Sequence, residues 1–173
     1  RRMKPGAWLL NTSRGAAVSN AALAQTLAAG TPAAAVLDVW EGEPAPDPVL
    51  VREVDLATPH IAGYSFDGKV QGTVMLYDAL ARHLDLPRTW NAEADFAPSP
   101  EDHLALDPPD DTLSGTAWLE ALVRSMYDIA ADDGRMRGLL NLPPEMHASY
   151  FSDLRKHYPR RRAFHQHTVR REA

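Results

Sequence analysis

Three short runs of apolar residues, each followed by a polar turn, predict the strands of a sheet. The first run covers residues 7–11, the second covers residues 33–39, and the third covers residues 54–58. The second run is apolar almost throughout, with Asp38 as the exception, and this pattern is typical of a strand covered on both faces in a parallel sheet. The hydrophobic pattern therefore predicts an α/β fold built on parallel strands.

A helix is predicted between the first two strands. Ser19 or Asn20 can cap its N-terminus, and apolar positions recur at helical spacing over residues 21–27. Gly30 and Pro32 then end it, because glycine accepts a left-handed conformation and proline cannot continue a helix. The order strand, helix, strand implies a right-handed crossover unit.

The pattern becomes mainly helical after the third strand. Apolar positions three or four residues apart predict a long helix over residues 66–84. Residues 87–112 are rich in proline and acidic residues and poor in large apolar ones, which indicates a linker or a loosely packed loop. We expect further helices over residues 118–134 and 144–157, and a strand within residues 162–169.

These elements predict three parts of the chain. Residues 1–86 form a first domain with its long helix, residues 87–112 form a linker, and residues 113–173 form a small second α/β domain. A segment as short as the last one has little interior of its own, so burial of its apolar helix faces in an oligomer is a plausible source of stability.

Composition excludes several classes of function. The formal net charge is −5, from 18 Lys and Arg against 23 Asp and Glu, so we expect no nucleic-acid partner. Residues 155–171 carry a concentrated positive charge, which we interpret as a solvated or subunit-facing surface. There is no cysteine, and no apolar run approaches the roughly 20 residues that span a bilayer. We therefore expect no disulfide, no membrane partner and a cytoplasmic location.

The residues with candidate chemistry lie where strands give way to loops. Arg14, Asp38 and His60 each fall at or just after the carboxyl end of a predicted strand, which is where ligands bind in open α/β sheets. Arginine can hold a carboxylate through two parallel hydrogen bonds, and histidine can exchange a proton near neutral pH. Glu43 is the candidate to orient the histidine and to fix its tautomer.

Three motifs give the chain a resemblance to a known family. Residues 11–15 read Asn-Thr-Ser-Arg-Gly, residues 37–39 read Leu-Asp-Val and are followed by Glu43-Pro44, and residues 59–61 read Pro-His-Ile. With these motifs the sequence resembles the D-2-hydroxyacid dehydrogenase family over roughly residues 3–85. The resemblance implies that the first domain is the C-terminal half of a Rossmann-type NAD-binding domain.

The segment after the long helix indicates which subgroup of the family the sequence resembles. The motif at residues 154–162, together with residues 40–44 and 60–65, is similar to a subgroup of this family. In that subgroup a C-terminal α/β domain follows the helix and mediates dimerisation. The resemblance therefore implies a homodimer formed through residues 113–173.

The resemblance also implies roles for individual residues. The catalytic residues would be Arg14, which binds the substrate carboxylate, His60 as general acid and base, and Glu43, which orients His60. Arg14 and Tyr64 would contact the substrate, a small phosphorylated 2-hydroxy acid. NAD would be held by the residues at the strand ends and the following loops, namely Thr12, Ser13, Arg14, Asp38 and Gly63. No metal is implied.

One signature of the family is not found. Residues 1–173 contain no Gly-x-Gly-x-x-Gly turn, which cradles the cofactor pyrophosphate at a helix N-terminus. We therefore expect this chain to be the C-terminal portion of a longer enzyme and to neither bind NAD tightly nor turn over by itself.

Other interpretations remain open at this level. His165 and His167 could face one side of a strand as metal ligands, but no cysteine or carboxylate lies at a convincing spacing, so a surface or interface role is favoured. The chain could act mainly as an interaction module that dimerises through residues 113–173. It could also belong to a dehydrogenase for another D-2-hydroxy acid.

Overall fold

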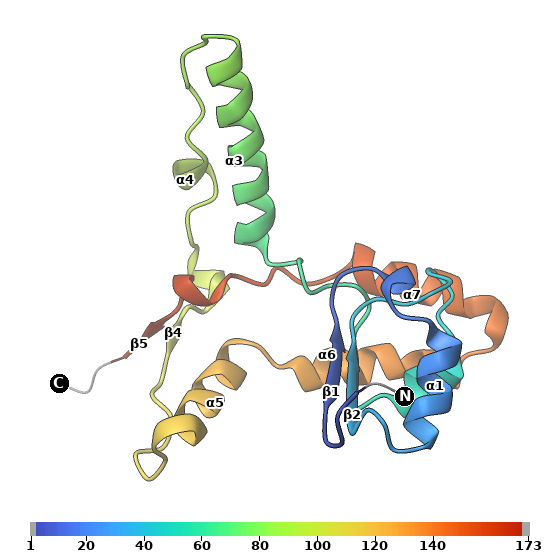
Figure 1. Ribbon diagram of the computed structural model, residues 1–173. Coiled ribbons are helices and arrows are strands. Elements are labelled where there is room, and N and C mark those ends of the chain that lie inside the picture. The colour runs from blue at the N-terminus through green and yellow to red at the C-terminus, as the bar shows by residue number, and fades with distance from the viewer. Residues whose placement is uncertain (1–2, 171–173) are drawn as a thin grey trace. The chain divides into compact units, whose positions relative to one another are not determined.

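The structure is a computed structural model that describes residues 3–170 (Figure 1). The described chain forms two compact units. The first comprises residues 3–62 and 129–158, and the second comprises residues 63–128 and 159–170. Within residues 3–170, no helix is long and apolar enough to cross a membrane.

The first unit is built on a parallel sheet of three strands in the order β1-β2-β3. The strands are β1 (Trp8–Asn11), β2 (Ala34–Leu37) and β3 (Leu56–Ala57). Asn11 lies opposite Leu37, and Leu37 lies opposite Ala57, so the carboxyl ends of all three strands meet at one edge. The predicted α/β fold class with parallel strands is confirmed.

Two helices connect the strands, and each begins at a side-chain cap. Helix α1 (Asn20–Ala28) follows Ser19, whose hydroxyl accepts a hydrogen bond from the Ala22 amide. Helix α2 (Pro48–Glu53) follows Asp47, which caps the Val49 amide, and places Pro48 in its first turn. A short 3₁₀ helix, η1 (Gly15–Ala17), turns the chain between β1 and α1.

The remainder of the first unit comes from much later in the chain. It consists of α6 (Ile129–Arg137), η3 (Gly138–Asn141), η4 (Pro144–Met146) and α7 (His147–Lys156). The single helix predicted over residues 118–134 is wrong, because the extended backbone at Tyr127 ends one helix and α6 begins two residues later.

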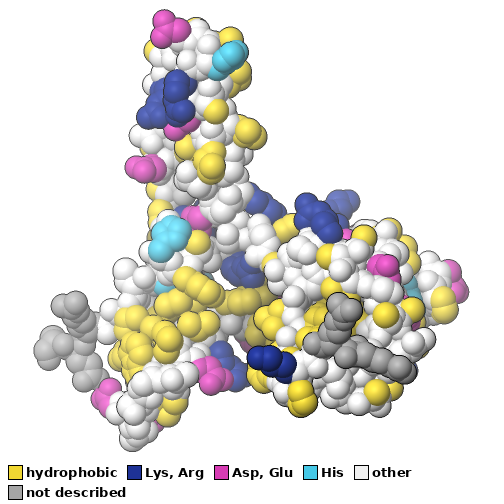
Figure 2. Space-filling model, in the orientation of Figure 1, with side chains coloured by type: hydrophobic (Ala, Val, Ile, Leu, Met, Phe, Trp, Pro, Cys, Tyr) yellow, Lys and Arg dark blue, Asp and Glu magenta, His cyan; other side chains and the backbone are white. Residues whose placement is uncertain are grey.

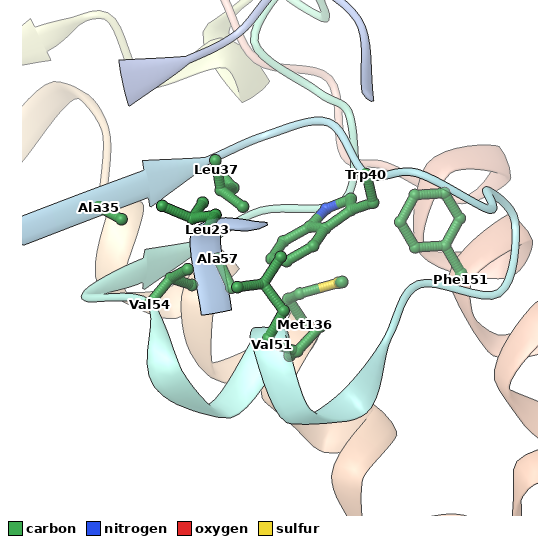
Figure 3. Packing of buried hydrophobic residues seen from close by; sticks show 10 residues of the cluster. Leu23, Ala35, Leu37, Trp40, Val51, Val54, Ala57, Met136 and Phe151 are labelled. Carbon is green, nitrogen blue, oxygen red and sulfur yellow. The ribbon is translucent and has the colours of Figure 1, made fainter. Parts of the chain in front are cut away.

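The core of the first unit collects side chains from both sequence segments. Figure 3 shows Leu37 of β2, Trp40, Val51 of α2, Met136 of α6 and Phe151 of α7, all at most 2% exposed, in one buried cluster. Alternate residues of the sheet belong to the opposite face. There Trp8 and Leu10 of β1 are 70% and 65% exposed, so this face is open in the described chain.

The second unit contains a long helix and a small parallel pair of strands. Helix α3 (Phe66–His83) begins at Ser65, whose hydroxyl accepts a hydrogen bond from the Gly68 amide. The other elements, in chain order, are α4 (Ala92–Asp95), η2 (Pro100–Asp102), β4 (Ala105–Leu106), α5 (Gly115–Met126), η5 (Phe164–Gln166) and β5 (Thr168–Val169). Strand β4 pairs with β5. The strand predicted within residues 162–169 is therefore reduced to its last two residues.

A buried arginine joins three segments of the second unit. The Arg162 side chain is 3% exposed and forms ion pairs with Asp67, at 2.8 Å, and with Asp102, at 3.0 Å. The pKa of Asp102 lies below its ordinary value, because the Ser99 amide donates a hydrogen bond to the carboxylate and Arg162 lies beside it. These contacts hold the start of α3, the η2 turn and the C-terminal segment together.

The compact units divide the chain differently from the predicted domains. Residues 129–158 pack in the unit that contains the sheet, whereas the predicted division groups them with residues 113–128. The domain boundaries at residues 86 and 112 stay a prediction.

Candidate functional site

The loop after β1 is shaped by the Asn11 side chain. Its carbonyl oxygen accepts hydrogen bonds from the Ser13 amide, at 3.2 Å, and from the Ser13 hydroxyl, at 2.8 Å. Its amide nitrogen donates to the Arg14 carbonyl at 3.0 Å. Asn11 is buried, so one side chain fixes the loop backbone while Arg14 stays exposed.

Gly15 brings this loop against the loop that follows β2. A Cβ atom at Gly15 would lie 2.1 Å from the carbonyl oxygen of Trp40, far closer than a side chain permits. Only glycine therefore fits between Arg14 and the backbone of Trp40 and Glu41. Arg14 therefore lies on a loop after β1 that contacts the loop after β2.

Asp38 ties the loop after β2 to the loop after β3. Its carboxylate accepts hydrogen bonds from the Thr58 hydroxyl, at 2.7 Å, and from the amides of Ile61, at 2.8 Å, and Ala62, at 3.0 Å. The residue is only 3% exposed. A buried carboxylate is stable when donors surround it, and here those donors belong to the segment that contains His60.

Glu43 and His60 form the central pair of the site. One carboxylate oxygen of Glu43 lies 2.7 Å from Nδ1 of His60, and the other accepts a hydrogen bond from the Trp40 amide at 2.9 Å. His60 adopts a left-handed backbone conformation with φ of 57°. The side chains of His60 and Glu43 are 27% and 21% exposed, so the pair is partly sheltered but reachable.

This arrangement can move a proton. A carboxylate at Nδ1 favours the tautomer that carries its proton there, which leaves Nε2 of the neutral ring as an acceptor. An imidazole held in this way can take a proton from a hydroxyl group and return it. The geometry thus provides a general acid and base with a fixed ring orientation.

The structure places the other predicted site residues as follows. Thr12, Ser13 and Arg14 are exposed on the loop after β1, and Arg14 forms no ion pair within residues 3–170. Gly63 and Tyr64 begin the second unit, where the Lys69 ammonium lies 3.7 Å from the centre of the Tyr64 ring. Glu43 and His60 are in direct contact, and Asp38 binds the backbone next to His60.

Sequence reasoning missed two contributors to this site. The Trp40 indole donates a hydrogen bond to the Thr58 carbonyl at 3.0 Å, and its amide holds Glu43. Thr58 in turn donates its hydroxyl proton to Asp38. Trp40 opens the segment at residues 40–44 and Thr58 precedes the Pro-His-Ile motif, and their polar atoms close to the strand ends were the available signal.

Among the described residues there is a groove but no candidate metal site. Within the described part of the chain, no group of three or more His, Asp or Glu residues could hold a metal ion. A groove of about 940 Å³ lies in the second unit between α3 and residues 88–98 and 162–166, and none of the predicted site residues lines it.

Residues 1–62, which carry the strand ends described above, are similar to domains of known proteins. Residues 1–62 match the family model described as "D-isomer specific 2-hydroxyacid dehydrogenase, NAD binding domain". Residues 1–62 are therefore similar to the NAD-binding domain of these dehydrogenases, and the predicted resemblance and the predicted cofactor, NAD, agree with this match. Residues 110–173 match a domain of unknown function.

Three similar proteins each carry the description erythronate-4-phosphate dehydrogenase. The protein of Salinibacter ruber is 51% identical over 168 residues, which are 97% of this chain and 43% of the relative. The proteins of Cellvibrio japonicus and Azotobacter vinelandii are 41% and 44% identical, over 99% and 93% of this chain and 46% and 42% of their own lengths. The chain thus spans less than half the length of these relatives.

Proposed function

We propose that this chain carries the proton-transfer half of an NAD-dependent dehydrogenase that oxidises 4-phospho-D-erythronate to its 2-oxo acid. This reaction would serve the biosynthesis of pyridoxal 5′-phosphate, vitamin B6. The observation that carries the proposal is the contact of 2.7 Å between Glu43 and His60 at the carboxyl edge of the sheet. The identity to relatives named for this substrate supports the choice of substrate.

The proposed roles follow from the chemistry of each group. Arg14 binds the substrate carboxylate and polarises the C2 oxygen, because a guanidinium matches a carboxylate with two hydrogen bonds. His60 takes the proton of the C2 hydroxyl, and Glu43 stabilises the imidazolium that results. The C2 hydrogen leaves as hydride, which NAD accepts when it is bound. Tyr64 contacts the substrate.

The proposed NAD contacts lie at the same strand ends. Asp38 would hold the carboxamide of the nicotinamide, because a carboxylate can accept more hydrogen bonds than the three it accepts from Thr58, Ile61 and Ala62. Thr12, Ser13 and Gly63 line the remainder of the cofactor site. Residues 1–173 contain no Gly-x-Gly-x-x-Gly turn, so we expect isothermal titration of this chain with NAD to show no micromolar affinity. A micromolar dissociation constant would contradict that expectation.

A chimeric enzyme tests the activity. The part of the Salinibacter ruber relative that precedes the aligned region is joined in frame to this chain, and NADH formation is followed with 4-phospho-D-erythronate. We expect activity that falls at least 100-fold in His60→Asn and less steeply in Glu43→Gln, because an orienting group contributes less than the base itself. A well-folded chimera in which His60→Asn keeps full activity refutes the assignment.

A homodimer through residues 113–173 and a cytoplasmic location complete the proposal. Helix α5 leaves Leu119 55% exposed, and Leu113 just before it is 37% exposed. Hydrophobic side chains gather over the region of α5 (Figure 2), which provides apolar area for a subunit contact. Sedimentation equilibrium should give twice the monomer mass of 19.0 kDa. A monomer at all concentrations that can be measured would remove the dimer from the proposal.

Two alternatives predict different results in the same assays. If the chain is mainly an interaction module, it dimerises strongly while the chimera is inactive with any 2-hydroxy acid. If the substrate is another D-2-hydroxy acid, the chimera reduces NAD with that acid and the His60→Asn variant again loses activity.

A further inference from the structure

The segment from α6 to α7, residues 129–158, contacts the part of the first unit that holds Glu43 and His60 in place. We call it the α6–α7 module. It lies within the region that matches a domain of unknown function. The module packs against Trp40, whose amide binds Glu43, and it forms a hydrogen bond with β3, the strand that leads to His60.

The contact on the Glu43 side is apolar. Met136 and Phe151 of the module are completely buried in the cluster that contains Trp40, as Figure 3 shows. Trp40 is the residue whose amide binds Glu43 and whose indole binds the Thr58 carbonyl. Because packed interiors transmit small displacements, a shift of the module would move the indole and both of its hydrogen bonds.

The contact on the His60 side is polar. The Asp133 carboxylate accepts a hydrogen bond from the Ala57 amide at 2.8 Å, three residues before His60. The other oxygen of Asp133 lies 2.8 Å from Nε of Arg137. Arg137 also donates to the carbonyls of Val51, at 2.9 Å, and Val54, at 2.8 Å, on the segment that leads into β3. Asp133 of the module thus accepts a hydrogen bond from a backbone amide at the edge of β3 that pairs with no strand in the described chain.

We propose that the α6–α7 module is a positioning element for the Glu43–His60 pair. The positioning residues are Asp133 and Phe151 of the module, together with Trp40, against which the module packs. The module sets the distance between the carboxylate and the imidazole by holding both loops that carry them. The proposal rests on the proposed function for the catalytic role of the Glu43–His60 pair. It concerns the geometry of the pair alone and is measured without turnover, so the two can fail separately.

The test is nitrogen NMR of the His60 ring in the 173-residue chain. A fixed carboxylate keeps the proton on Nδ1, so wild-type Nδ1 and Nε2 resonances are expected to be well separated. We expect Trp40→Phe, Phe151→Leu and Asp133→Ala each to bring the two resonances together as the second tautomer becomes populated. Trp40→Phe keeps an aromatic ring but loses the indole N–H that donates to the Thr58 carbonyl. This variant therefore tests the hydrogen bond while most of the packing is kept.

Two controls separate positioning from stability. Leu23→Ala removes a buried side chain of the same cluster from α1 instead of the module, and Asp153→Ala removes an exposed carboxylate of α7. Both should leave the His60 resonances in place, although Leu23→Ala should lower the urea midpoint at least as much as Phe151→Leu. Unchanged resonances in all three folded test variants, or an equal shift in Leu23→Ala, would overturn the proposal.

Discussion

Gly15 has no room for a side chain where its backbone meets that of Trp40. The distance of 2.1 Å between a built Cβ and the Trp40 carbonyl oxygen means that alanine must push two backbones apart. Overpacking of this kind costs roughly 1–3 kcal/mol. We expect Gly15→Ala to lower the free energy of unfolding of the first unit by about that amount, measured by urea titration with tryptophan fluorescence.

Gly72 provides the matched control for Gly15. It lies inside α3, and a Cβ atom there would meet no atom within 4 Å. Since alanine is the better helix former, Gly72→Ala should stabilise the chain by about 0.5–1 kcal/mol. Equal effects of the two substitutions would show that the contact with Trp40 has no consequence.

Asp38 provides a second prediction at the scale of one residue. Asp38→Asn keeps the shape but removes the charge and turns an amide group toward the donors Thr58, Ile61 and Ala62. Hydrogen bonds to charged groups contribute about 1.5–3 kcal/mol, so we expect a loss of that order. Faster hydrogen exchange of the Ile61 and Ala62 amides should accompany it. Exchange rates equal to wild type would contradict the role given to the carboxylate.

At the scale of elements, the Arg162 cluster predicts how the second unit responds to acid. The pKa of Asp102 is lowered in the folded state below the unfolded value of about 3.9. Its stabilising effect is therefore complete well above about pH 4 and is lost as the pH falls through the folded pKa. We expect Asp102→Asn to destabilise the second unit at about pH 6 and to make a smaller difference at about pH 3.

The measurement for this prediction is hydrogen exchange of amides in α3 and β4 at both pH values. Asp107→Asn is the matched control, since Asp107 is 78% exposed and pairs only with Arg170 among the described residues. A constant difference between wild type and Asp102→Asn across this pH range would contradict the prediction.

The elements also show where periodicity is informative. The run from Phe66 repeats at helical spacing and becomes α3, and the apolar runs before residue 60 become the three strands. The long helix predicted around Trp118 fails, because the apolar spacing continues through Tyr127 while its backbone turns extended. Hydrophobic spacing records which side chains face an interior, and two helices in succession can satisfy one spacing.

At the scale of the whole chain, the open face of the sheet predicts self-association. Trp8 and Leu10 are 70% and 65% exposed on neighbouring positions of one sheet face, beside the half-buried Val36. Exposed apolar patches of this kind associate in water. We expect Trp8→Ser combined with Leu10→Thr to reduce light scattering by concentrated solutions while the urea midpoint changes little. Unaltered scattering would show that another surface is responsible.

The substitution pair also separates two kinds of association. A specific dimer through residues 113–173 should survive it, because the core residues of that segment, Met136 and Phe151, pack on the face of the sheet opposite to Trp8 and Leu10. Loss of a defined dimer in the Trp8→Ser and Leu10→Thr variant would instead place the subunit contact on the sheet.

The sequence by itself determined the strand ends and the residues they carry. Arg14, Asp38 and His60 could be placed at one edge because parallel strands share one carboxyl edge, and Gly15 could be recognised as part of a motif. Only the tertiary structure decided that Gly15 meets Trp40, that Asp38 gathers donors from the His60 loop, and that Met136 and Phe151 complete the core beside Trp40. Local patterns report burial and backbone preference, whereas some of these contacts join residues more than a hundred positions apart, as Trp40 and Phe151 are, which no short-range pattern encodes.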